Sequence, residues 1–186
     1  PLTQDETQKI TLLGFSSYYP VQGGDMGSSL VENTGTDADT VDMVAAFKAK
    51  GFGLNQTVAD MYEALQPTFK SEVQSWGGTI EYNHITAPST TGVFSSKEPS
   101  QAALDGQNAT WKDSMNDNNV MIVTIARSAS ENGSYNPGTA GVDPTQNLNQ
   151  TDPLGLSDDE RDLIQAAVDA KASNGGKVIV LLNNAS

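Results

Sequence analysis

The chain contains no cysteine and a single histidine, His84, among its 186 residues. Without thiols it can form no disulfide, no thiolate metal site and no cysteine nucleophile. One imidazole also leaves little room for a zinc site or a Ser-His-Asp triad. We therefore expect neither a metal nor another cofactor.

Positive charge and long apolar runs are also scarce. Ten Lys and Arg stand against 23 Asp and Glu, which gives a formal net charge of −13. Because nucleic acids and anionic membranes attract basic surfaces, this balance argues against both as partners. No run approaches the roughly 18 apolar residues of a transmembrane helix, and no N-terminal segment is typical of a signal peptide. The composition fits both the bacterial cytoplasm and secretion, so localisation stays open.

Three near-continuous apolar runs predict β-strands. They cover residues 9–15, 119–125 and 177–182. A strand buried on one face alternates apolar and polar residues, whereas a strand buried on both faces of a parallel sheet is apolar throughout. The runs therefore predict the centre of a parallel sheet.

Helical patterns follow the first of these runs. Asp39 and Thr40 can cap a helix that Gly51 stops. A shorter helix is predicted over 58–65, ending before Pro67.

Further elements complete the pattern. Residues 52–55 predict a short strand and 109–115 a short helix. Ser157 and Glu160 have the spacing of a capping box, and an apolar stripe follows them up to residues 174–176. The alternation of strands and helices predicts one α/β domain over residues 1–186, with a mainly parallel sheet sandwiched by helices.

The segments after the strands hold the candidate site residues. Glycines within 23–27 would let the backbone approach a ligand, but they come too late for a dinucleotide fingerprint. A polar loop over 128–156 follows the strand at 119–125, at the edge where α/β proteins bind ligands. In this loop Glu131 suits a general acid or an ion-pair partner, although a solvated charge is the default for one of 23 acidic residues. Arg127, just before the loop, suits a substrate clamp, with a structural ion pair as the default.

Three further residues have two interpretations each. A packed or exposed role is favoured over catalysis for His84. Trp76 and Trp111 can stack on sugar rings, but packing in the core or an interface is the default for a tryptophan.

Four segments in register carry a resemblance. Pro1-Leu2 with KITLLG at 9–14 is similar to "LPL…kvavfG", and SYYPVQGGDMGS at 17–28 is similar to "Y-x-P-V-x-G-G-x-G-S". VMIVTIARS at 120–128, with Glu131, resembles "A-I-V-V-I-S-R-x-x-G-E-G". LSDDE and KVIVLLN, within 156–183, resemble "L-S-x-x-E…K-V-I-V-L-L-N". Together they resemble the second domain of glycoside hydrolase family 3 enzymes, over almost the whole chain.

The resemblance implies an α/β sandwich that packs beside a (β/α)8 barrel. Such enzymes are retaining β-glycosidases, in which a nucleophile and a general acid/base lie about 5–5.5 Å apart. The nucleophile is an aspartate of the barrel, and the acid/base is a glutamate in the loop after the matched strand. The resemblance thus assigns Glu131 as acid/base. It also implies that Asp25 and Met26 contact the leaving group, with Arg127 near the substrate.

The match departs from the family pattern at the proposed site. Ser130 and Asn132 stand where glycines flank the glutamate, and Ser134-Tyr135 replaces an Asp-Arg pair. Asp143 can replace that aspartate after an insertion.

The implied function is hydrolysis of a terminal β-linked sugar, with a β-glycoside or oligosaccharide as substrate and a β-glucosidase-like specificity. The chain would be inactive alone, because the barrel supplies the nucleophile. Its sheet would lack the last strands unless a neighbouring chain supplies them. The alternatives are a non-catalytic carbohydrate-binding or interaction module and, more weakly, a flavodoxin-like domain.

Overall fold

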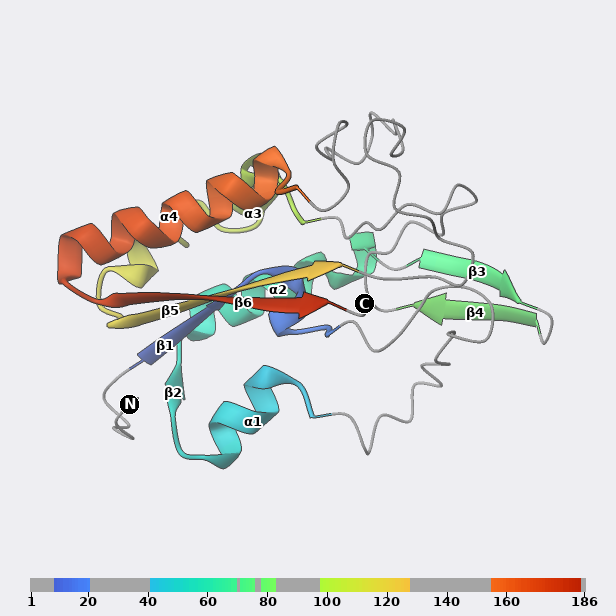
Figure 1. Cartoon of the computed structure of the whole chain (residues 1–186), viewed down its shortest axis with the longest axis horizontal. Coiled ribbons are helices and arrows are strands. Elements are labelled where there is room, and N and C mark those ends of the chain that lie inside the picture. The colour runs from blue at the N-terminus through green and yellow to red at the C-terminus, as the bar shows by residue number, and fades with distance from the viewer. Residues whose placement is uncertain are drawn as a thin grey trace.

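A computed structural model describes residues 9–20, 41–69, 71–75, 78–82, 98–127 and 155–184. Its main sheet has four parallel strands in the order β2–β1–β5–β6 (Figure 1). The strands are β1 (Lys9–Leu13), β2 (Gly53–Leu54), β5 (Val120–Arg127) and β6 (Lys177–Asn184). The predicted α/β class and parallel sheet are confirmed.

The remaining described elements are helices and one hairpin. The α-helices are α1 (Met43–Ala49), α2 (Gln56–Phe69), α3 (Gln101–Gln107) and α4 (Asp158–Asn174). Single 3-10 turns are η1 (Phe15–Ser17) and η3 (Asp113–Met115). The sequence patterns do not predict the antiparallel hairpin of β3 (Ser71–Ser75) and β4 (Gly78–Tyr82).

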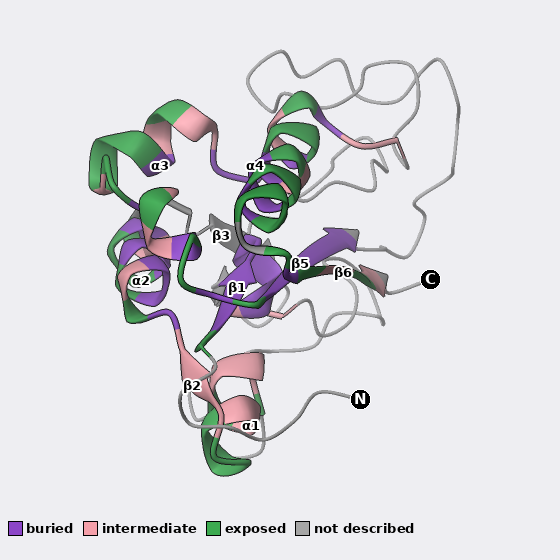
Figure 2. Cartoon of the chain, turned by 90° about the vertical axis from the view of Figure 1, so that its left-hand side faces the viewer, coloured by how far each residue is buried: buried purple, intermediate pink, exposed green. Residues whose placement is uncertain are grey.

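Helices cover both faces of the sheet, but unequally (Figures 1 and 2). The first face packs on α2, α3, η3 and α4 in one large apolar cluster. Its strand residues are Leu13, Met121, Val123 and Ile125. The second face presents Ile10, Leu12, Val120 and Ile122, and α1 packs on it through half-buried Met43, Val44 and Phe47.

Local sequence explains how α4 begins and ends. The Ser157 side chain accepts from the Glu160 backbone N–H, and the Glu160 side chain accepts from the Ser157 N–H, so the predicted capping box is confirmed. The helix ends where Gly175 adopts φ 71°, a conformation that glycine reaches without a Cβ clash.

Other helix boundaries differ from the predictions. The cap of α1 is Asp42, whose Oδ1 accepts the Ala45 N–H at 2.6 Å, not Asp39 or Thr40. Helix α2 runs past the predicted end and includes Pro67, which removes a helical hydrogen bond only near the last turn.

The predicted helix at 109–115 is wrong in position. The α-helix lies earlier, at α3, where Ser100 caps the Ala103 N–H, and 109–115 holds only turns and η3. Leu104 is the one buried residue within α3. A helix with a single buried apolar residue has no periodic signal to read.

Strand β6 forms an edge of the sheet, with β5 beside it and no described strand beyond it. Val180, Leu181 and Leu182 are 45%, 39% and 69% exposed. The predicted strand is confirmed, but its predicted burial on both faces is wrong. An edge strand has a neighbour on one side only, which leaves its apolar side chains less covered.

Candidate functional site

Because the strands are parallel, the carboxyl ends of β1, β5 and β6 lie together. We call this the carboxyl edge of the sheet, as distinct from the edge strand β6, and it is where α/β proteins bind ligands. Arg127 is the last residue of β5 and lies beside Asn184 of β6 in the register. The structure thus places the Arg127 backbone at the predicted edge. Asp25, Met26 and Glu131 lie outside the described residues, as do Trp76 and His84.

The chain leaves β1 at Gly14, directly against the backbone of β5. Gly14 has φ 90°, and a Cβ atom at this position would lie 2.3 Å from the Thr124 carbonyl oxygen. Only glycine fits this contact without a shift of backbone. The first strand-end loop, which we define as residues 14–20, is therefore held close to the central strand.

Short polar side chains join the first strand-end loop to β1, β5 and β6. The Ser17 hydroxyl lies 2.8 Å from the Leu13 carbonyl oxygen and 2.7 Å from Thr124 Oγ1, which connects β1 with β5. Asn183 Nδ2 of β6 donates to Ser16 Oγ at 2.8 Å. Because Ser17 and Thr124 are buried, these bonds fix the first strand-end loop within the fold.

Aromatic rings support the same loop. Tyr18 stacks on Tyr62 of α2 with centroids 4.8 Å apart, and Tyr19 packs on Phe15 at 4.7 Å. The Tyr18 hydroxyl donates to the Leu12 carbonyl at 2.9 Å. Burial raises the pKa of Tyr18, so its hydroxyl stays a proton donor to this strand.

A buried carboxyl group, Glu98, binds the start of the loop. The Phe15 N–H donates to Glu98 Oε2 at 2.9 Å and lies 3.2 Å from Oε1. The Tyr62 hydroxyl donates to Oε1 at 3.1 Å and accepts from the Gly14 N–H at 3.0 Å. Glu98 is 8% exposed and Tyr62 is fully buried.

Burial raises the pKa of Glu98 to about 8, although hydrogen bonds from Phe15 and Tyr62 act in the opposite direction. Glu160 and Asp159 raise it further through charge repulsion. The two ion pairs among the described residues, Lys112–Asp105 and Arg161–Asp158, do not include it. The raised pKa favours the protonated form of Glu98 near neutral pH.

Sequence patterns gave no signal for Glu98. It lies among 23 acidic residues, ahead of Pro99 and outside any apolar stripe. Its position depends on segments 36 and 83 residues away along the chain.

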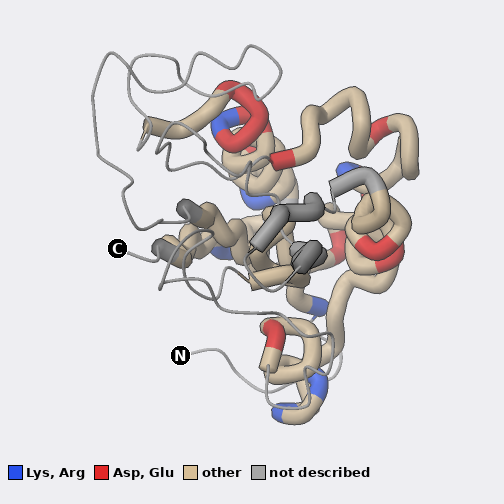
Figure 3. The backbone as a smooth tube through the Cα atoms, turned by 90° about the vertical axis from the view of Figure 1, so that its right-hand side faces the viewer, with Lys and Arg blue, Asp and Glu red and all other residues tan. Residues whose placement is uncertain are grey.

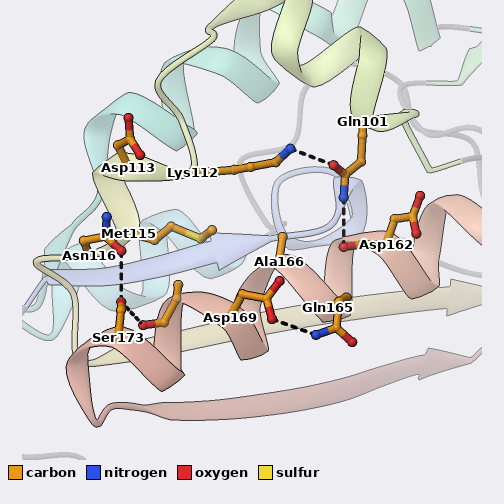
Figure 4. Close-up of a pocket in the computed structure, with 11 residues that line it drawn as sticks. Gln101, Lys112, Asp113, Met115, Asn116, Asp162, Gln165, Ala166, Asp169 and Ser173 are labelled. Atoms are coloured by element: carbon orange, nitrogen blue, oxygen red, sulfur yellow. Dashed lines mark hydrogen bonds between the residues drawn. The ribbon is translucent and has the colours of Figure 1, made fainter.

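A cleft of about 310 Å³ lies elsewhere, along α4 and opposite α3 and η3 (Figure 4). Polar groups across it already bind one another: Lys112 Nζ donates to Gln101 Oε1 at 2.7 Å, and Gln101 Nε2 donates to the Asp162 carbonyl at 3.0 Å. Small residues Ala166 and Ala170 line it. The cleft therefore lies between helices whose polar groups bind one another, and it contains no predicted site residue.

Trp111 directly precedes Lys112, which lines this cleft, and is fully buried. Its Nε1 donates to Asp105 Oδ1 at 2.8 Å, and Lys112 Nζ lies 5.3 Å from the ring centroid. Core packing, the default interpretation, is confirmed. A ring without exposed surface cannot stack on a sugar.

Acidic residues are spread along the described chain, including the first turn of α4 (Figure 3). Within the described ranges, no three His, Asp or Glu side chains gather as metal ligands would. Nor is any helix there long and apolar enough to cross a membrane.

Comparison with known proteins finds similarity in three-dimensional structure. No protein-family model matches the chain, and no curated protein sequence matches it. Its structure is similar to that of β-glucosidase 3B from Thermotoga neapolitana, solved with α-D-glucose, with glucose and with glycerol. The TM-scores are 0.58, 0.57 and 0.56, at 22%, 22% and 21% identity.

The shared property is the fold. Each match covers 98% of this chain but 21% of the β-glucosidase chain, so this chain spans about a fifth of that enzyme's length.

Proposed function

We infer that this chain is the second, α/β domain of a glycoside hydrolase family 3 β-glycosidase, and that Glu131 is the general acid/base. The observation that carries this proposal is the fold shared with a β-glucosidase over 98% of the chain. The four matched sequence segments support it. So does the position of β5, which ends at Arg127, four residues before Glu131.

The proposed chemistry needs two carboxyl groups. An aspartate of the barrel attacks the anomeric carbon, while Glu131 protonates the leaving oxygen and then removes a proton from the attacking water. A nearby carboxylate raises the pKa of a general acid, so docking of the barrel would prepare Glu131 for proton donation. The partner is thus the barrel, and the substrate is a terminal β-linked sugar, with glucose favoured.

The first strand-end loop leads toward Asp25 and Met26, which we propose border the leaving group. Arg127, at the end of β5, would lie on the substrate side of the same edge. The 186-residue chain alone would lack activity, because the nucleophile belongs to the barrel.

The decisive experiment uses the full-length enzyme that carries this domain. Glu131→Gln should lower kcat by about 10²–10⁴-fold on an alkyl glucoside, whose leaving group needs protonation, and far less on a dinitrophenyl glucoside. Azide should restore turnover by replacing the activated water. Asp152→Asn, in the same loop, is the matched control and should retain most activity. Near-wild-type turnover of Glu131→Gln on both substrates would remove Glu131 from this role.

The second candidate is a carbohydrate-binding module, favoured by Ser130 and Asn132, which replace the glycines of the family pattern. It predicts that the chain alone binds glucose or cellobiose. The enzyme proposal predicts no measurable heat of binding, because the barrel forms most of the sugar pocket. Isothermal calorimetry of the 186-residue chain separates the two.

A further inference from the structure

We propose that Tyr19 is a substrate-contact residue: its ring and hydroxyl bind a sugar on the leaving-group side of the site, together with the carboxylates of Asp42 and Glu63. The identity of the substrate rests on the proposed function. The three side chains all belong to the described residues.

The first step is the place of Tyr19 in the fold. It lies in the first strand-end loop, which leaves β1 at the carboxyl edge (Figure 1). Strand β5 pairs with β1 and leads, at the same edge, toward the proposed acid/base, Glu131. Loops that follow adjacent parallel strands emerge side by side, and ligands of α/β proteins bind among such loops. Tyr19 therefore follows the strand next to the one that leads to the group that would protonate the leaving oxygen.

The second step is a difference between two adjacent tyrosines. The Tyr18 hydroxyl donates to the Leu12 carbonyl oxygen at 2.9 Å, and its ring stacks on Tyr62. Tyr19 is half-buried, and among the described residues none forms a hydrogen bond with its hydroxyl. A phenol of this kind presents an apolar ring and a polar tip to a ligand. The fold thus uses the hydroxyl of Tyr18, whereas that of Tyr19 suits a ligand.

The third step is the chemistry around the Tyr19 ring. The ring packs on buried Phe15, with centroids 4.7 Å apart. Burial raises the pKa of Tyr19, and the carboxylates of Glu63 on α2 and Asp42 at the start of α1 raise it further through charge repulsion. The hydroxyl therefore stays a neutral donor with two carboxylates near it.

This combination fits a sugar. A sugar has apolar C–H faces, which an aromatic ring covers, and hydroxyl groups, which donate charge-assisted hydrogen bonds to carboxylates. A phosphate would be repelled by the same carboxylates. Neither Asp42 nor Glu63 belongs to the two ion pairs of the described ranges, Lys112–Asp105 and Arg161–Asp158.

The fourth step is the rigidity of the loop that carries Tyr19. The Tyr19 N–H donates to the Phe15 carbonyl oxygen at 2.9 Å, so the residue closes the turn that starts the loop. The Ser17 hydroxyl holds this turn to Thr124 of β5 at 2.7 Å. A contact residue on a fixed backbone binds its ligand with little loss of conformational entropy. The backbone of Tyr19 is therefore in place before a substrate arrives.

The test compares two substrates of the full-length enzyme that carries this domain. Cellobiose and methyl β-glucoside share the glucose whose bond is broken, but only cellobiose brings a second sugar ring to the leaving-group side. Tyr19→Leu removes the aromatic ring and the hydroxyl, and it should lower kcat/KM for cellobiose by about tenfold with little change for methyl β-glucoside. Tyr19→Phe should lower the cellobiose value by about threefold.

Two matched controls accompany these variants. Tyr18→Phe is the same substitution at the neighbouring tyrosine, and it should reduce stability but leave the ratio of the two kcat/KM values unchanged. Glu63→Gln should lower the ratio by about threefold, because an amide is a weaker acceptor than a carboxylate. Asp60→Asn, an exposed acid one turn earlier on α2, should not change it.

Two results would overturn the proposal. One is an unchanged ratio in both Tyr19 variants, and the other is an equal loss on both substrates, which indicates a structural role. If Tyr19→Leu does not fold, Tyr19→Phe decides, because it keeps the ring and its packing on Phe15.

Failure of the proposed function has a different signature. If the full-length protein hydrolyses neither substrate, the proposed function is wrong, and calorimetric titration with cellobiose decides about Tyr19. Binding that weakens about tenfold in Tyr19→Leu supports the contact without hydrolysis. Absence of binding, or equal binding by wild type and variant, contradicts it.

Discussion

Gly14 and Thr124 meet backbone to backbone where β1 ends, with no room for a side chain between them. The contact joins the turn after β1 to the middle of β5. It exists because Gly14 has a positive φ, which turns the chain sideways as the strand ends.

Substitution at this contact should be severely destabilising. Gly14→Ala places a Cβ atom 2.3 Å from the Thr124 oxygen at φ 90°, and we expect it to lower the free energy of unfolding by about 3 kcal/mol or more. Gly106→Ala is the matched control, since it meets no atom within 4 Å and lies inside α3. Urea denaturation should show it slightly more stable than the wild type, by about 0.5–1 kcal/mol. Equal free energies of unfolding for the two variants would contradict the contact.

The Tyr62 hydroxyl should contribute more to the free energy of unfolding than an exposed phenol would. Tyr62→Phe removes the acceptor of Gly14 and a donor to Glu98, so the free energy of unfolding should fall by about 1–3 kcal/mol. Tyr19→Phe, on the same loop but half-buried, should change it by less than about 0.5 kcal/mol. Chemical denaturation at pH 7 measures both, and a neutral Tyr62→Phe would argue against the network.

Stability should depend on pH through Glu98. Its pKa is raised from 4.5 to about 8 on folding, so the folded state holds a proton that the unfolded state has lost. This contribution is fully present below pH 4.5 and is lost as pH rises through 8. The difference in unfolding free energy between wild type and Glu98→Gln should therefore favour the wild type most at low pH. A difference that stays constant from pH 5 to pH 9 would exclude a shifted Glu98.

The exposed edge of β6 should promote self-association. Val180 lies in an apolar stretch of an edge strand, where unpaired backbone groups recruit other strands. Val180→Lys should lower the average mass measured by sedimentation at high concentration. Val168→Lys serves as control, because Val168 is similarly exposed but lies on α4. If both lysines act alike, net charge and not the edge explains the effect.

Sequence patterns predicted the elements that local chemistry determines. The apolar runs of β1 and β5, the capping box of α4 and the stop at Gly175 are visible because each depends on residues close together in the chain. Helix α3 and the β3–β4 hairpin were not predictable in this way, since neither shows a clear apolar period.

The buried site was beyond sequence patterns for a different reason. Glu98 is distinguished from the other acids by its contacts with Tyr62 and Phe15, and these arise only after α2 and β1 have packed. The exposure of β6 likewise depends on its place at the sheet edge, which an apolar run does not reveal. The roles of Asp25, Met26 and Glu131 remain predictions from the resemblance.

Because helices cover the two faces of the sheet unequally, they should also detach in a definite order as the protein unfolds. Helix α1 has no fully buried residue, whereas α2 and α4 carry much of the main cluster. Segments with few buried contacts detach at a small fraction of the total unfolding free energy. Among the described helices, α1 should therefore be the first that protease cuts, in molecules whose strands and α4 are still assembled.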